Sequence, residues 1–263
     1  MPTKRIGLVL SGGAALGAAH IGVLEVLDAY GIRPDCVAGT SAGSAVGALV
    51  CAGIPPGKIR ELALGLQWRK LGRLVRPGRG FFDGHRIEQY LVRLVGDITI
   101  DQLQIPLAVS AADILCEELV IQREGPLGPA VRASCALPGV FTPVEYGDRL
   151  LVDGGLVNNL PVSAVLEMDA DYVIAVDLSA PLVGMRGTPR TMLDMWWLTL
   201  ATLLRNVHRE AELADVVIEP AVGEFNLADL SKVPLLIERG REAAEAAIPQ
   251  MLRDLGMEEG VEG

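Results

Sequence analysis

The sequence lacks paired cysteines and an excess of basic residues, and both shortages exclude classes of protein. Its four cysteines, Cys36, Cys51, Cys116 and Cys135, show no CxxC spacing, so neither a zinc site nor a disulfide framework is indicated. Lys and Arg number 23 against 33 Asp and Glu, and the net charge of −10 repels phosphate backbones. We therefore expect no nucleic-acid partner and a reducing, cytoplasmic compartment.

The sequence also lacks an apolar run long enough to cross a bilayer. Ile6–Leu10 is shorter than a signal-peptide core and is expected to be a buried strand. Met192–Leu204 is interrupted by Asp194 and falls short of the roughly 20 residues that a spanning helix needs. With Trp196 and Trp197 at its centre, it could rest on a lipid interface or a partner, although a buried core helix is the commoner outcome. Peripheral contact with the inner membrane surface stays open, because half of the 263 residues are apolar.

Short β-branched runs alternate with longer helical patterns, which predicts an α/β domain with a mainly parallel sheet. The expected strands are Arg5–Leu10, Cys36–Gly39, Leu107–Ala111, Leu119–Gln122, Leu150–Val152, Tyr172–Val176 and Val216–Glu219. The expected helices are Ala14–Ala29, Ala42–Ala52, His85–Val95 and Pro234–Leu255. The first three end at Gly31, Gly53 and Gly96, which suit a left-handed cap. One domain over residues 1–257 is expected, with 258–263 as a frayed tail.

Glycines and a proline interrupt the alternation of strand and helix patterns between Leu71 and Gly84, so a long loop is expected there. Basic and aromatic residues gather around it: Trp68, Arg69, Lys70, Arg73, Arg76, Arg79, Phe81 and Phe82. One interpretation is a lid or patch that meets an anionic headgroup or a membrane interface. The alternative is a solvated basic loop, which is the usual role of a charge run.

A candidate nucleophile, Ser41, lies in the GTSAG segment Gly39–Gly43, between an expected strand and an Ala-rich helix. The flanking Gly39 and Gly43 allow a sharp strand-to-helix turn that would hold the hydroxyl above the sheet. The helix N-terminus favours negative charge developing there. Close packing of small residues is the alternative explanation of this pattern.

A second glycine-rich turn, from Ser11 to Gly17, also follows a strand and opens a helix. Its spacing does not match the GxGxxG dinucleotide fingerprint, so a nucleotide site is weakly supported. Free backbone N–H groups at Gly12, Gly13 and Ala14 could instead form an oxyanion hole, because the first two βα turns of a parallel sheet can lie side by side.

The three histidines are poor candidates for the base that a serine nucleophile needs. His208 falls in a run typical of a helix end, His20 lies among apolar helix positions, and His85 fits a helix start. A carboxylate with a raised pKa is the alternative base.

Three aspartates, Asp113, Asp153 and Asp177, stand just after expected strands, and spacing alone does not choose among them. Asp153 differs in being followed by Gly154 and Gly155, which allow a tight turn close to another backbone.

Together these motifs resemble the patatin-like phospholipase family, in particular its bacterial members similar to the catalytic domain of neuropathy target esterase. The residues that carry the resemblance are Leu10–Gly13 with Gly17, Ala19–Leu24, Gly39–Gly43, Phe82–Gly84, Ala133–Val144 and Asp153–Pro161. The resemblance implies a three-layer α/β/α fold and a Ser–Asp dyad, with Ser41 as nucleophile and Asp153 as general base. It also implies an oxyanion hole at Gly12–Ala14 and no metal or cofactor.

The resemblance further implies a serine lipid acyl hydrolase, acting on a lipid or other carboxylic ester through an acyl-enzyme. Two residues depart from the family pattern: Ala14 replaces a glycine and Leu16 replaces a basic residue. These departures motivate an alternative, a weakly active or inactive member that serves as a regulatory or lipid-binding module. An acyltransferase is a third possibility, because an acceptor other than water can resolve an acyl-enzyme.

Overall fold

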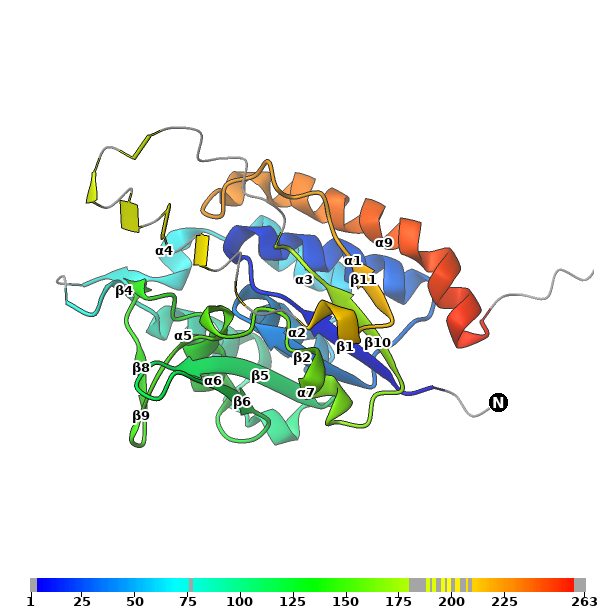
Figure 1. Cartoon of the computed structure of the whole chain (residues 1–263), viewed down its shortest axis with the longest axis horizontal. Helices are drawn as coiled ribbons and strands as arrows, with labels where there is room; N and C mark the ends of the chain where they lie inside the picture. Colours follow the sequence, from blue (N-terminus) through cyan, green and yellow to red (C-terminus); the bar gives the residue numbers. More distant parts are fainter. Residues whose placement is uncertain are drawn as a thin grey trace, which may run out of the picture.

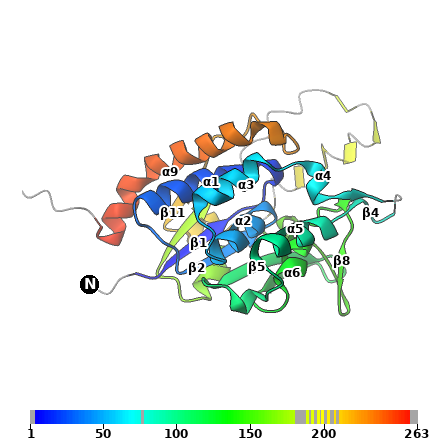
Figure 2. The same ribbon diagram turned by 180° about the vertical axis from the view of Figure 1, so that it is seen from behind.

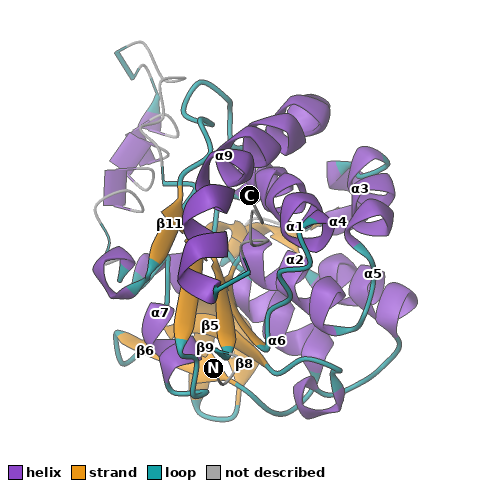
Figure 3. Cartoon of the chain, turned by 90° about the vertical axis from the view of Figure 1, so that its right-hand side faces the viewer, coloured by secondary structure: helices purple, strands orange, loops and turns teal. Residues whose placement is uncertain are grey.

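In the computed structural model the described residues are 4–75, 78–179, 188–189, 191–192, 195–196, 198–199, 202–203, 207 and 210–257. A twisted sheet runs through the middle of the chain with helices on both of its faces (Figure 1, Figure 3). Its strand order is β11-β10-β1-β2-β5-β9-β8, with β6 paired to β5. The strands are β1 (Ile6–Leu10), β2 (Cys36–Thr40), β5 (Leu107–Asp113), β6 (Glu118–Gln122), β8 (Val144–Tyr146), β9 (Arg149–Asp153), β10 (Tyr172–Val176) and β11 (Val216–Ile218).

The central strands are apolar at nearly every position because both faces of the sheet are covered. In β1, Leu8 and Leu10 belong to the larger core on one face, whereas Val9 belongs to the smaller core on the other. β1 pairs in parallel with β2 and β10, β2 with β5, and β10 with β11, while β6, β8 and β9 add antiparallel pairs. The mainly parallel three-layer α/β/α fold expected from the sequence is confirmed.

Most helices cover one face of the sheet, as the view from behind shows (Figure 2). They are α1 (Ala18–Ala29), α2 (Ala42–Cys51), α3 (Pro56–Leu64), α5 (His85–Val95), α6 (Leu127–Ser134) and α9 (Val233–Leu255). The opposite face carries α7 (Val162–Leu166). Short 3-10 turns occur at Ala14–Gly17, Ile100–Gln102, Gly154–Leu156, Ala211–Leu213 and Leu230–Lys232. The three helix-ending glycines all have positive φ, with values of 71°, 83° and 90°. Gly96 has a ψ of 171°, so it ends α5 in an extended conformation and not in the expected left-handed helical one.

Helices α1 and α9 cross at two glycines. A Cβ atom on Gly22 would lie 1.9 Å from the Ile237 carbonyl oxygen, and one on Gly240 would lie 1.9 Å from the Ala19 carbonyl oxygen. Only glycine therefore permits this close approach of the two backbones.

The long loop expected between Leu71 and Gly84 is wrong in part. A short helix α4 (Trp68–Leu71) is followed by β3 (Arg73–Leu74) and β4 (Gly80–Asp83), which pair antiparallel. β4 also pairs in parallel with β7 (Gly139–Phe141). The partner strand lies far along the chain, so the local glycine and proline content gave no sign of this small sheet.

Residues 192–204 are described only in part, and Trp197 lies outside the described residues. The side chains of Met192, Met195 and Leu203 are 91%, 50% and 59% exposed, so a buried core helix is wrong for these positions. Trp196 packs close to Gly139. Within the described part of the chain, no helix is both long and apolar enough to span a membrane.

Candidate active site

Ser41 sits on a sharp turn between β2 and α2, as its GTSAG context predicts. Its φ of 52° and ψ of −121° place a non-glycine residue in a strained conformation of the kind that persists at functional sites. A Cβ on Gly43 would lie 2.1 Å from the Leu10 carbonyl oxygen, and one on Gly39 would lie 2.7 Å from the Gly43 carbonyl carbon. Both flanking positions therefore require glycine.

Two serines hold the backbone of Ser41 from opposite sides. The Ser41 N–H donates to Ser134 Oγ at 2.8 Å, and Ser44 Oγ donates to the Ser41 carbonyl at 2.7 Å. These two positions were missed by the sequence reasoning, because a serine near a helix end carries no signal of a distant partner. Their bonds stabilise the strained turn.

Asp153 ends β9, where Ala111 of β5 pairs with it, and its side chain is 5% exposed. The N–H of Gly155 donates to Asp153 Oδ1 at 2.9 Å. Burial raises the pKa of this carboxyl to about 6, and hydrogen bonds from the Ser41 side chain and the Gly155 N–H partly oppose that rise. The structure therefore brings the two residues of the expected dyad together.

Gly154, between Asp153 and Gly155, approaches β5 closely, since a Cβ there would lie 2.4 Å from Ser110 Oγ. Ser110 Oγ in turn shares a 2.6 Å hydrogen bond with Thr40 Oγ1, and Thr40 directly precedes Ser41. The double glycine after Asp153 thus permits the tight contact that the sequence suggested.

The other aspartates make local turns instead. Asp113 Oδ1 accepts N–H bonds from Leu115 and Leu150, at 3.1 and 3.4 Å. Asp177 Oδ1 accepts from the Ser179 N–H at 2.8 Å. Only Asp153 among the three lies against Ser41.

The histidines take the roles expected of them where they are described. His20 is fully buried, its Nε2 lies 2.8 Å from the Ser11 carbonyl oxygen, and burial lowers its pKa to about 4. His85 begins α5 and pairs with Asp83 on the surface. His208 lies outside the described residues.

The glycine-rich turn lies beside Ser41, since a Cβ on Gly12 would lie 3.2 Å from Ser41 Cβ. The Gly12 N–H, expected among the oxyanion-hole donors, instead donates to Asn159 Oδ1 at 3.1 Å. Among the described residues no acceptor is found for the N–H groups of Gly13 and Ala14. Ala14 has a φ of 49°, so the alanine that replaces the family's glycine is strained.

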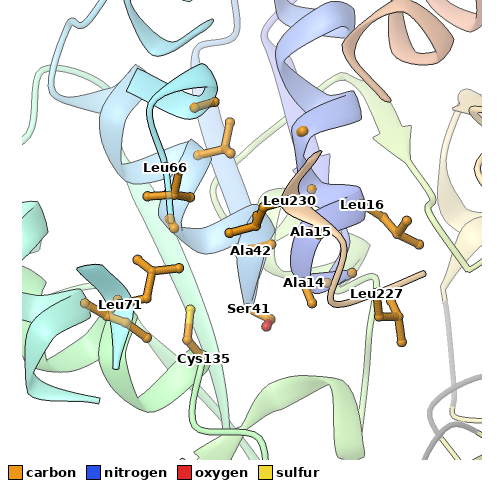
Figure 4. Close-up of a pocket in the computed structure, with 18 of the residues that line it drawn as sticks. Ala14, Ala15, Leu16, Ser41, Ala42, Leu66, Leu71, Cys135, Leu227 and Leu230 are labelled. Carbon is orange, nitrogen blue, oxygen red and sulfur yellow. The ribbon is translucent and has the colours of Figure 1, made fainter. Parts of the chain in front are cut away.

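A pocket of about 590 Å³ extends from Ser41 and Asp153 between the helices (Figure 4). Its walls are mainly aliphatic and come from α1, α2, α3 and α5, together with the segment before α9. The volume is in the range of pockets that enclose a small ligand. Cys135 also lies near Ser41 (Figure 4), and burial with the nearby Asp153 raises the pKa of its thiol to about 12, so it stays protonated.

The described residues contain no group of three or more His, Cys, Asp or Glu side chains arranged to hold a metal ion. The fold and site thus define a class: α/β proteins that carry a serine on a strand-to-helix turn beside a buried carboxylate and an apolar pocket. A family model described as patatin-like phospholipase matches residues 8–166. The chain belongs to the patatin-like phospholipase family.

Similar proteins agree with this membership. The chain is 31% identical to the uncharacterized NTE family protein Rv2565 of Mycobacterium tuberculosis (strain ATCC 25618 / H37Rv), over 95% of this chain and 48% of that protein. It is 34% identical to patatin-like phospholipase domain-containing protein 6 of Mus musculus, over 73% of this chain and 15% of that protein. The chain thus spans about half the length of its mycobacterial relative.

A solved structure shows the same fold. VipD from Legionella pneumophila superposes with a TM-score of 0.69 at 15% sequence identity, covering 96% of this chain and 67% of that one. At this identity the match concerns the fold alone.

Proposed function

We propose that the chain is a serine lipid acyl hydrolase that uses a Ser41–Asp153 dyad. The observation that carries the proposal is one juxtaposition: a serine on a strained turn, a buried carboxylate with a raised pKa, and the end of an apolar pocket. Buried, catalytically tuned carboxylates of this kind serve as general bases.

In the proposed reaction, the Ser41 hydroxyl attacks the ester carbonyl and its proton passes to Asp153. The N–H groups of Gly13 and Ala14, with that of Ala42 after the nucleophile, stabilise the oxyanion. The ester C–O bond breaks, the leaving alcohol takes the proton from Asp153, and an acyl group remains on Ser41 Oγ. Water then attacks the acyl-enzyme with Asp153 again as base, releasing the carboxylic acid and restoring Ser41.

The proposed substrates are phospholipids, lysophospholipids or other carboxylic esters of long apolar acids. The aliphatic walls of the pocket support this class, because an acyl chain gains free energy when it leaves water for such a site. A relative from Mycosarcoma maydis, 32% identical over 74% of this chain, is named Lysophospholipase NTE1, which points to the same class. This reaction needs no cofactor.

A second candidate is a weakly active or inactive lipid-binding module. It is favoured by the strained Ala14 in the turn beside Ser41 and by Leu16, which is buried at 1% exposure where the family pattern has a basic residue. Strain at Ala14 costs about 1 kcal/mol and leaves the N–H groups in place, so the hydrolase is preferred.

Labelling with a fluorophosphonate probe, mapped by peptide mass, separates the two candidates. The probe needs an activated serine, so we expect stoichiometric labelling at Ser41 and none in Ser41→Ala. Absence of labelling in well-folded protein, with detergent or lipid present, would favour the lipid-binding module.

A further inference from the structure

The mouth of the pocket carries exposed apolar side chains. Trp68 and Phe82 line the pocket and are 40% and 38% exposed, so the cavity reaches the surface between them. Just outside the cavity, Leu74 pairs with Phe82 and is 71% exposed. Phe81 precedes Phe82 on β4, projects from the other face of that strand and is 41% exposed. We call these four side chains the rim. Large exposed apolar groups gathered around an opening indicate a contact surface.

The small sheet and one hydrogen bond fix the rim in place. Leu74 of β3 stands opposite Phe82 of β4, and Phe82 stands beside Phe141 of β7, with ring centroids 6.2 Å apart. The Trp68 Nε1–H donates to the Ala228 carbonyl at 2.7 Å. The exposed rim is therefore continuous with buried apolar residues that border the pocket.

The charge around the rim opposes that of the whole chain. The described residues 66–75 and 78–86 contain five basic residues and one acidic residue, Asp83, although the net charge of the chain is −10. Arg69 and Lys70 are exposed and have no carboxylate partner among the described residues. Arg73 lies 3.7 Å from Asp83, and Arg79 pairs with Glu145 of β8 at 2.7 Å. A locally positive surface on an acidic protein attracts an anionic partner.

We infer that the rim and its basic neighbours are a docking surface for an anionic lipid bilayer, an inference that rests on the proposed function. Apolar side chains flanked by Arg and Lys fit the boundary between headgroups and acyl chains. The same surface surrounds the opening of the pocket, so docking places the cavity mouth against the lipids. Figure 1 shows α4 and β4 on the same side of the molecule. An acidic protein would satisfy the cations and leave the apolar mouth unexplained.

Flotation with vesicles of phosphatidylcholine, with or without phosphatidylglycerol, tests the surface. The assay uses Ser41→Ala, so binding is measured independently of turnover. We expect binding to the anionic vesicles and a reduction of about 30-fold in affinity for Arg69→Gln with Lys70→Gln. Leu74→Ser with Phe81→Ser should reduce affinity about tenfold or more.

Matched controls lie outside α4, β3 and β4: Tyr30 and Arg33 follow α1, Leu166 ends α7, and Arg253 lies near the end of α9. Arg33→Gln with Arg253→Gln removes two exposed charges, and Tyr30→Ser with Leu166→Ser removes two apolar side chains that are 48% and 41% exposed. Both controls should bind as Ser41→Ala does. Equal binding by the rim variants, or no binding to either vesicle, would overturn the inference and leave a protein partner as the explanation of the surface.

A second readout uses the wild-type catalytic residues. The rim variants Leu74→Ser and Phe81→Ser lie outside the cavity, so they should hydrolyse a water-soluble short-chain ester at the normal rate and vesicle lipids more slowly. A chain that hydrolyses neither substrate contradicts the proposed function, while the flotation result still decides the docking surface. An equal loss on both substrates contradicts the docking surface.

Discussion

Replacing Asp153 by Asn should abolish turnover and stabilise the fold, and the gain in stability should depend on pH. Burial raises the Asp153 pKa from 3.8 to about 6. The folded state therefore keeps a proton that the unfolded state releases, and the wild-type chain loses stability as pH rises through this window. Such a pKa difference corresponds to about 3 kcal/mol once the pH is well above 6.

Asparagine has no ionisation cost, and its Oδ1 can still accept the Gly155 N–H. Relative to wild type, we expect Asp153→Asn to gain about 1 kcal/mol at pH 4.5 and about 3 kcal/mol at pH 8, apart from a pH-independent offset. At pH 8 the melting temperature should rise by roughly 6–12 °C. Urea denaturation and thermal scans across this pH range measure the difference.

The kcat/KM of the wild-type chain should depend on the protonation of the Asp153 carboxyl. If Asp153 is the base, kcat/KM rises as pH passes through about 6 and then reaches a plateau. Asp113→Asn is a matched control in another buried aspartate and should retain activity. A stability difference between Asp153→Asn and wild type that is the same at pH 4.5 and pH 8 would refute the raised pKa.

Three further substitutions have defined expectations. Ser134→Ala removes the acceptor of the Ser41 N–H, so kcat should fall roughly tenfold with little change in KM; unchanged kcat would show that this bond does not position the nucleophile. Gly22→Ala places a methyl group against the Ile237 carbonyl and should destabilise the fold by about 1–3 kcal/mol in urea denaturation, whereas a neutral result would mean that α1 and α9 can separate freely. Ala14→Gly should stabilise by about 0.5–1 kcal/mol by relieving the left-handed alanine, and destabilisation in the same assay would contradict that strain.

The fold was largely predictable because its signals are local. The apolar runs gave all the strands of the parallel core, and the glycines at 31, 53 and 96 marked three helix ends. The small sheet of β3, β4 and β7 was missed because Gly80 pairs with Gly139, a contact that neither local segment reveals. Helices α3, α6 and α7 were also missed, since each begins next to a proline, a residue that marks a turn as readily as a helix start.

The candidate site was predictable only as separate pieces. Ser41 and the glycine-rich turn could be found from strand-to-helix context, but the choice of Asp153 over Asp113 and Asp177 came from resemblance. The structure distinguishes them, because β9, which ends at Asp153, pairs with β5, and β5 pairs with β2, the strand that leads to Ser41. Engagement of the Gly12 N–H by Asn159 likewise depends on a contact across 147 residues.

The glycine crossing of α1 and α9 has a consequence for synthesis on the ribosome. Leu230, just before α9, and Val233, its first residue, line the same pocket as Ser41. Helix α9 packs on α1 at Gly22 and Gly240. A nascent chain that has already exposed Ser41 and Asp153 still lacks this wall until α9 emerges. The cavity beside Ser41 is thus assembled late, and unfinished chains lack one of its walls.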